Sequence, residues 1–62
     1  MSRSKIDTLV HARRLAGGVS RLAEAIEVDA YVLDEMLHGI TETPSWVLER
    51  AQEFIRAAES DE

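Results

Sequence analysis

Residues 15–28 read LAGGVSRLAEAIEV, and this stretch decides the fold. Glycine adopts the left-handed backbone conformation without a Cβ penalty, so the pair at residues 17–18 is expected to end any helix before it. After the pair, apolar residues recur at helical spacing, at Val19, Leu22, Ala23 and Ile26. The stretch therefore predicts one helix that ends near residue 16 and a second over about residues 19–26.

A third helix is predicted a few residues further on. Asp29 is a good N-cap, because its carboxylate accepts hydrogen bonds from the N–H groups of a first helical turn. An apolar stripe follows at helical spacing, formed by Leu33, Met36, Leu37 and Ile40. Gly39 is the expected stop, which gives a helix over about residues 30–38. Residues 27–29 are too few for an ordinary antiparallel hairpin, so we expect a helix-turn-helix with a steep crossing.

The flanking segments predict one helix on each side of this unit. Ser4 followed by Asp7 resembles a capping box, and a stripe of Ile6, Leu9 and Val10 begins there. Thr43 and Pro44 are typical of an N-cap and a first helical position. The last stripe consists of Val47, Leu48, Ala51, Phe54, Ile55 and Ala58. Because no stretch alternates as a strand does, we expect an all-α fold, a compact bundle of four or five helices.

The stripes are expected to converge on one core within a single domain over residues 1–62. We expect residues 1–3 and the polar tail of residues 59–62 to fray. The expected centre of the core consists of Leu22, Ile26, Leu33, Leu37 and Phe54. Trp46 lies one position off the last stripe, so we expect it to be partly buried, at the helix start or at a dimer seam.

Composition limits the classes of protein to which the chain can belong. Seven Lys and Arg residues against 12 Asp and Glu residues give a net charge of −5 over 62 residues. Residues 1–21 hold five basic residues and one acid, a net +4, whereas residues 22–62 hold two basic residues and eleven acids, a net −9. The longest apolar run, Ala30–Leu33, is only four residues long, which excludes a membrane span. We expect a small cytoplasmic protein that binds or regulates a partner.

No group of polar side chains has the spacing of a catalytic or ligand motif. Cysteine is absent, which excludes disulfides, thiolate zinc sites and cysteine nucleophiles. Residues 17–18 lack the Lys and Ser or Thr that complete a phosphate-binding P-loop. Asp34 and His38 lie four residues apart, but the interaction of His38 with the helix end explains this spacing better than a metal does. We expect no enzyme activity, no cofactor and no metal.

The chain resembles the helix-turn-helix of phage Cro and lambda-repressor-like regulators. In that family a glycine-rich lead-in is followed by a Leu-Ala pair and then an Ile/Leu-Gly-Val turn, which correspond here to residues 17–18, 22–23 and 26–28. Leu33, Met36, Leu37 and Gly39 continue the match, which covers about residues 6–56. The resemblance implies a bacterial or phage DNA-binding transcription regulator that acts as a dimer, with its third helix in the major groove.

The resemblance also implies which residues contact DNA. The phosphate contacts would come from Arg14, Ser20 and Arg21. The base-facing positions would be Ala30, Tyr31, Asp34 and Glu35. Glu27 stands where the family has its turn glycine, so either Glu27 adopts a positive φ or the turn is reshaped.

The charge of the third helix supports a second hypothesis. Base readout relies on Arg, Lys, Asn and Gln, whereas this segment carries Asp29, Asp34 and Glu35. The alternative is a module of helix-turn-helix shape that has lost DNA binding. In that case the same third-helix positions would face a basic protein partner.

Overall fold

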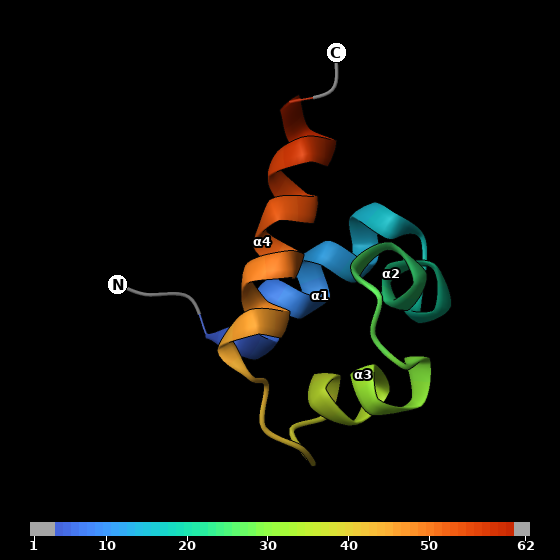
Figure 1. The fold of residues 1–62 in the computed structure, drawn as a ribbon, viewed down its shortest axis with the longest axis vertical. Coiled ribbons are helices and arrows are strands. Elements are labelled where there is room, and N and C mark those ends of the chain that lie inside the picture. Colours follow the sequence, from blue (N-terminus) through green and yellow to red (C-terminus); the bar gives the residue numbers. More distant parts are fainter. Residues whose placement is uncertain (1–3, 61–62) are drawn as a thin grey trace.

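The computed structural model describes residues 4–60, which form four α-helices and no strand (Figure 1). These are α1 (Lys5–Ala16), α2 (Val19–Ile26), α3 (Ala30–Leu37) and α4 (Ser45–Ser60). The expected all-α fold is confirmed, with four helices in the described range. Residues 1–3 and 61–62, part of the ends expected to fray, lie outside that range, and residues 59–60 belong to α4.

Both ends of α1 are capped as the sequence predicts. Ser4 Oγ accepts a hydrogen bond from the Asp7 N–H at 3.1 Å, which satisfies a donor of the first turn. Gly17 has φ 96°, and its N–H donates to the Arg13 carbonyl oxygen at 3.0 Å. Glycine takes this left-handed conformation without steric cost, so α1 ends there and the chain turns into α2.

The connection between α2 and α3 keeps its tight shape although it lacks a glycine. Glu27 has φ 62° and ψ 48°, and within residues 4–60 it is the one non-glycine residue with a positive φ. Of the two expected alternatives, the structure therefore has a positive φ at Glu27 and not a reshaped turn. Asp29 Oδ1 then accepts from the N–H groups of Tyr31 at 2.8 Å and Val32 at 3.4 Å, which caps α3 as predicted.

Two expected boundaries shift in the segment between α3 and α4. α3 ends at Leu37, and His38 is its C-cap. α4 begins at Ser45, because the Pro44 carbonyl accepts the first helical hydrogen bond, from the Leu48 N–H at 3.1 Å. Pro44 therefore takes the N-cap position expected for Thr43, and Thr43 is instead buried, with its carbonyl accepting from Lys5 Nζ at 3.2 Å.

All four helices contribute to the core, which includes four of its five expected central residues. The largest fully buried side chains are Leu9, Leu22, Leu33 and Val47. Leu22, Ile26, Leu33 and Leu37 are buried as predicted, but Phe54 is only half-buried at the edge of the core. Figure 1 shows that the last turns of α4 extend beyond the other helices, and Phe54 precedes these turns.

The packing of the helices leaves α3 at one end of the molecule. α1 and α4 form the most extensive helix–helix contact, and α2 packs on both α1 and α4. α3 packs on α1 and α2 and makes no backbone contact with α4. One face of α3 is therefore directed away from the rest of the protein (Figure 1).

Candidate interaction surface

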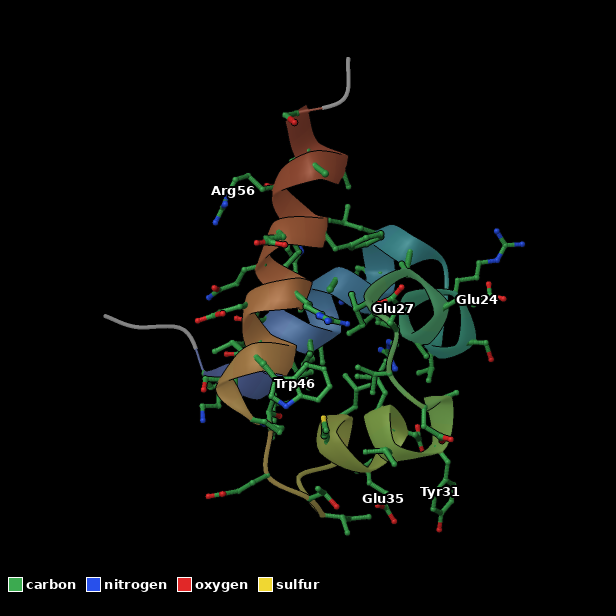
Figure 2. The ribbon with its side chains drawn as sticks, in the orientation of Figure 1. Glu24, Glu27, Tyr31, Glu35, Trp46 and Arg56 are labelled. Carbon is green, nitrogen blue, oxygen red and sulfur yellow. The ribbon has the colours of Figure 1, made fainter. Side chains whose placement is uncertain are left out.

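The exposed side of α3 presents Tyr31, Asp34 and Glu35, which we call the outer α3 face. Tyr31 is 73% exposed, and Asp34 is also exposed. Tyr31 and Glu35 are four residues apart and therefore share one side of the helix. Figure 2 shows that both side chains point in the same direction, away from the other helices. This face can contact a partner without any rearrangement of the fold.

The two acidic residues of the outer α3 face differ in their contacts. Glu35 is half-buried, and its Oε1 accepts from Thr41 Oγ1 at 3.1 Å, so this carboxylate holds the segment after α3. Asp34 is more accessible, and its carbonyl oxygen lies 2.8 Å from His38 Nδ1, while its Oδ1 lies 3.6 Å from the same nitrogen. Asp34 is consequently the more available hydrogen-bond acceptor of the two.

Ala30 contributes less to this surface than the sequence suggested. It is half-buried and packs against the core, as does its neighbour Val32. Both residues lie in the first turn of α3 and pack against the rest of the protein. Within that turn, the aromatic ring of Tyr31 is the main group presented to a partner.

The residues expected to contact phosphates lie around the junction of α1 and α2. Arg14 lies in the last turn of α1, and Ser20 and Arg21 lie in the first turn of α2. All three are exposed, and neither arginine forms an ion pair within the described part of the chain. Gly18, the N-cap of α2, supplies no side-chain acceptor to the first turn. The positive end of the α2 dipole is thus open to an anion.

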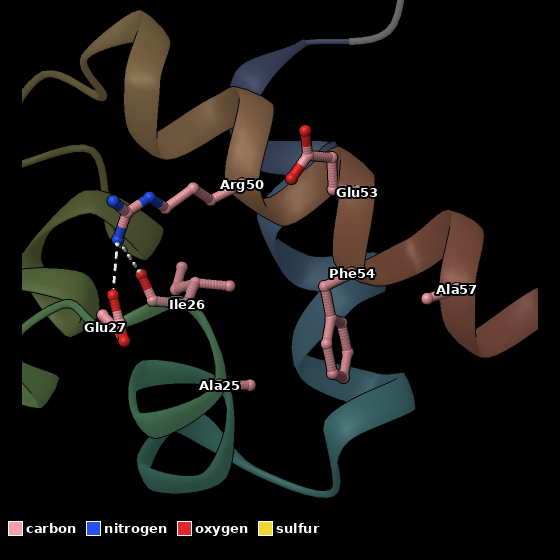
Figure 3. A pocket seen from close by; sticks show the side chains of 7 residues that line it. All are labelled: Ala25, Ile26, Glu27, Arg50, Glu53, Phe54 and Ala57. Carbon is pink, nitrogen blue, oxygen red and sulfur yellow. Dashed lines mark hydrogen bonds and ion pairs between the residues drawn. The ribbon is translucent and has the colours of Figure 1, made fainter.

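A residue that sequence reasoning missed, Arg50 of α4, braces the α2–α3 turn. Its Nη1 donates to the Ile26 carbonyl at 3.0 Å and lies 3.2 Å from Glu27 Oε1 (Figure 3). Its guanidinium carbon lies 5.2 Å from the ring centroid of Trp46, which is 51% exposed at the second position of α4. The four-residue spacing of Trp46 and Arg50 is visible in the sequence, but their contact with the turn is not.

Neither a metal centre nor a membrane segment is found in the described range. Between residues 4 and 60, no three His, Asp or Glu side chains are close enough to hold a metal ion. None of the helices in that range is both long and apolar enough to cross a bilayer.

Comparisons with protein-family models, curated proteins and solved structures find no match for this chain. Its function has to be inferred from its own residues.

Proposed function

We propose that this chain is a small DNA-binding transcription regulator of the helix-turn-helix type. The observation that carries the proposal is the α2–turn–α3 unit. Two eight-residue helices are joined by residues 27–29, with Glu27 held in the left-handed conformation. In such a unit α2 lies across the DNA backbone and α3 enters the major groove. The exposed outer α3 face is consistent with that role.

The phosphate contacts are assigned to Arg14, Ser20 and Arg21. These side chains are exposed, and the uncapped start of α2 adds a positive dipole end beside them. Each neutralised phosphate contributes about −0.9 to the slope of log affinity against log salt. With two arginines per protomer in these positions, the slope is only about −1.8, so binding is weak and is strengthened by dimer formation.

The base contacts are assigned to the outer α3 face. A carboxylate in the major groove accepts a hydrogen bond from the cytosine amine, and an apolar ring contacts the thymine methyl group. The Asp34 carboxylate is the more available hydrogen-bond acceptor, and Tyr31 supplies the ring. Glu35 has a smaller share, because Thr41 already donates to its carboxylate.

A chemical-shift titration tests the proposal. ¹⁵N-labelled protein is titrated with mixed-sequence duplex DNA at low salt and again at about 0.2 M salt, where phosphate contacts weaken. We expect salt-sensitive shifts at Arg14, Ser20 and Arg21 and along the outer α3 face. Arg21→Glu should abolish them, because it reverses the charge beside the phosphates. If the wild type shows no shifts at low salt, the proposal is wrong.

Arg56→Glu is the matched control for Arg21→Glu. It makes the same charge change on α4, at an exposed position that Figure 2 shows far from Tyr31 and Glu35. A loss of binding through net charge alone would appear equally in both variants. We expect Arg56→Glu to retain most of the wild-type shifts, so an equal loss in the two variants would contradict the assigned contacts.

A second candidate function follows from the charge of the same face. Between Arg21 and Arg50 the chain has no Lys or Arg, and the accessible charges of the outer α3 face are acidic. We propose as the alternative that this face binds a basic protein segment and that DNA binding has been lost. Titration with a lysine-rich peptide then shifts α3, the paired change Tyr31→Ala and Asp34→Lys removes that response, and DNA gives none.

A further inference from the structure

His38 is the only residue between Arg21 and Arg50 whose side chain can carry a positive charge. It is the C-cap of α3, and its backbone N–H donates to the Asp34 carbonyl oxygen at 3.1 Å, so it continues the last helical turn. Residues four and seven positions apart share one side of a helix, which places His38 on the side of Asp34 and Tyr31. His38 therefore borders the outer α3 face.

The His38 ring is held in one orientation by the backbone of Asp34. Its Nδ1 lies 2.8 Å from the Asp34 carbonyl oxygen. A carbonyl oxygen can only accept a hydrogen bond, so Nδ1 carries the proton of the neutral ring. The other ring nitrogen, Nε2, has no hydrogen-bond partner within residues 4–60, and the side chain is 63% exposed. In the neutral ring Nε2 is thus an acceptor that is left for water or for a partner.

A proton taken up at Nε2 changes what this nitrogen offers to a partner. Histidine changes its charge between pH 5 and 8, whereas Asp and Glu stay ionised over most of that range. The protonated nitrogen is a charge-assisted donor, which suits a phosphate oxygen or the acceptors of guanine. The outer α3 face and His38 together then change from two carboxylates without a cation to two carboxylates with one.

The charged groups around His38 leave its charge available to a partner. Among residues 4–60, Asp34 is the one acid paired with it, with Oδ1 3.6 Å from Nδ1. Glu35 accepts from Thr41, and Glu42 of the following segment is exposed. The helices that pack on α3 carry further charged side chains, none of which forms an ion pair with His38: Lys5, Asp7, Arg13, Arg14, Arg21 and Glu24.

We propose that protonation of His38 regulates DNA binding by the outer α3 face, and that the protonated ring itself contacts the DNA. α3 carries no Arg, Lys, Asn or Gln, so at acidic pH His38 supplies the missing donor. Its charge also offsets part of the repulsion between Asp34 and the phosphates. A carboxylate has two oxygens, so the pair with His38 still leaves Asp34 an acceptor for a cytosine amine. The inference deepens the proposed function and rests on it.

The direction of the pH effect depends on the charge of the partner. DNA is anionic, so its affinity for the outer α3 face rises when His38 gains a proton. A lysine-rich peptide is cationic, so its affinity for the same face falls on protonation. The two candidate functions of this face therefore give pH effects of opposite sign, although His38 is the source of both.

DNA affinity at pH 5.5 and pH 7.5, at one low salt concentration, tests the proposal. We expect the wild type to bind mixed-sequence duplex DNA about tenfold more tightly at pH 5.5, the effect of one charge-assisted hydrogen bond. His38→Gln cannot be charged and should bind at both pH values as the wild type does at pH 7.5. His38→Lys stays charged over this range and should bind at both values nearly as the wild type does at pH 5.5.

His11→Gln is the matched control, because it removes the other histidine of the chain. His11 Nε2 lies 2.8 Å from Glu59 Oε2, so this residue belongs to the contact between α1 and α4 and not to the outer α3 face. The variant should keep the tenfold difference between the two pH values. Circular dichroism at both values checks that each variant is folded. A folded His38→Gln variant that keeps the pH dependence overturns the proposal.

The same measurements separate failure of this inference from failure of the proposed function. DNA binding that is equal at the two pH values leaves the proposed function standing and overturns the role of His38. A wild type that binds no DNA at either value overturns the proposed function, and the DNA contact of His38 with it. A lysine-rich peptide that then binds the wild type more weakly at pH 5.5, but not His38→Gln, supports regulation of this face by His38 with a protein as the partner.

Discussion

The Arg50 guanidinium donates to the Ile26 carbonyl over 3.0 Å and thereby joins α4 to the last residue of α2. Carbonyl groups at a helix C-terminus have no partner within their own helix, so this bond satisfies an acceptor that α2 leaves open. The same nitrogen lies 3.2 Å from Glu27 Oε1, and the Trp46 ring stacks on the guanidinium. A helix with no backbone contact to α3 thus fixes the turn from which α3 starts.

Removal of this guanidinium should lower stability. We expect Arg50→Ala to reduce the free energy of unfolding by about 1 kcal/mol, mostly through the lost bond to Ile26, because exposed ion pairs contribute little. Arg50→Lys should lose less stability, since it keeps the positive charge. It should still lose some, because lysine lacks the planar fork and the stacking. Urea unfolding followed by circular dichroism measures both variants. Equal stability of Arg50→Ala and the wild type would contradict the bracing role.

Glycine at position 27 should relieve backbone strain. A left-handed conformation costs an ordinary residue about 1–2 kcal/mol, while glycine adds about 0.5–1 kcal/mol of chain entropy to the unfolded state. Glu27→Gly also loses the pair with Arg50, so the net gain in the wild type is small. In an Arg50→Ala background that pair is already absent, and the gain should be larger. A double-mutant cycle on thermal unfolding measures the difference, and a gain no larger in that background would refute the coupling.

The cap of α3 should be sensitive to the loss of one side-chain oxygen. Asp29→Ala removes the acceptor of the Tyr31 and Val32 N–H groups, which should cost about 1 kcal/mol. Asp29→Asn should be nearly neutral, because an asparagine oxygen caps equally well. Hydrogen exchange of the first-turn amides of α3 should accelerate in the alanine variant alone. Equally accelerated exchange in the asparagine variant would mean that the charge of Asp29, and not its capping oxygen, stabilises this turn.

Two positions in the first half of α3 should respond very differently to truncation. Leu33 is fully buried, so Leu33→Ala should cost about 2–5 kcal/mol and unfold much of a domain this small. Tyr31 is 73% exposed, so Tyr31→Ala should change stability by less than about 0.5 kcal/mol. Thermal unfolding compares the two. A large loss in Tyr31→Ala would mean that the ring supports the fold and not a partner surface.

Sequence patterns predict the helices well where the deciding interactions are local. The bounds of α2, the left-handed Gly17 and the capping Asp29 follow from residues within one helical turn of each other. The start of α4 and the half-burial of Phe54 do not, because both depend on how α4 lies against the other helices. Ile40 also departs from its expected stripe, since α3 ends three residues before it.

The candidate surface is predicted only in part, for the same reason. Helical periodicity is enough to predict that Tyr31 and Asp34 are exposed. It does not reveal that Thr41 folds back to donate to Glu35, or that Ala30 packs against the core. The contact of Arg50 with Ile26 joins residues 24 positions apart, and no local pattern specifies such a pair.

The extensive contact between the first and last helices has a consequence for synthesis. Val47 and Ala51 of α4 are fully buried, so the last third of the chain supplies part of the core. A nascent chain that has reached only α3 leaves the side of α1 that meets α4 uncovered. Cooperative folding therefore waits until α4 has left the ribosome, and until then that side of α1 is the surface available to a chaperone.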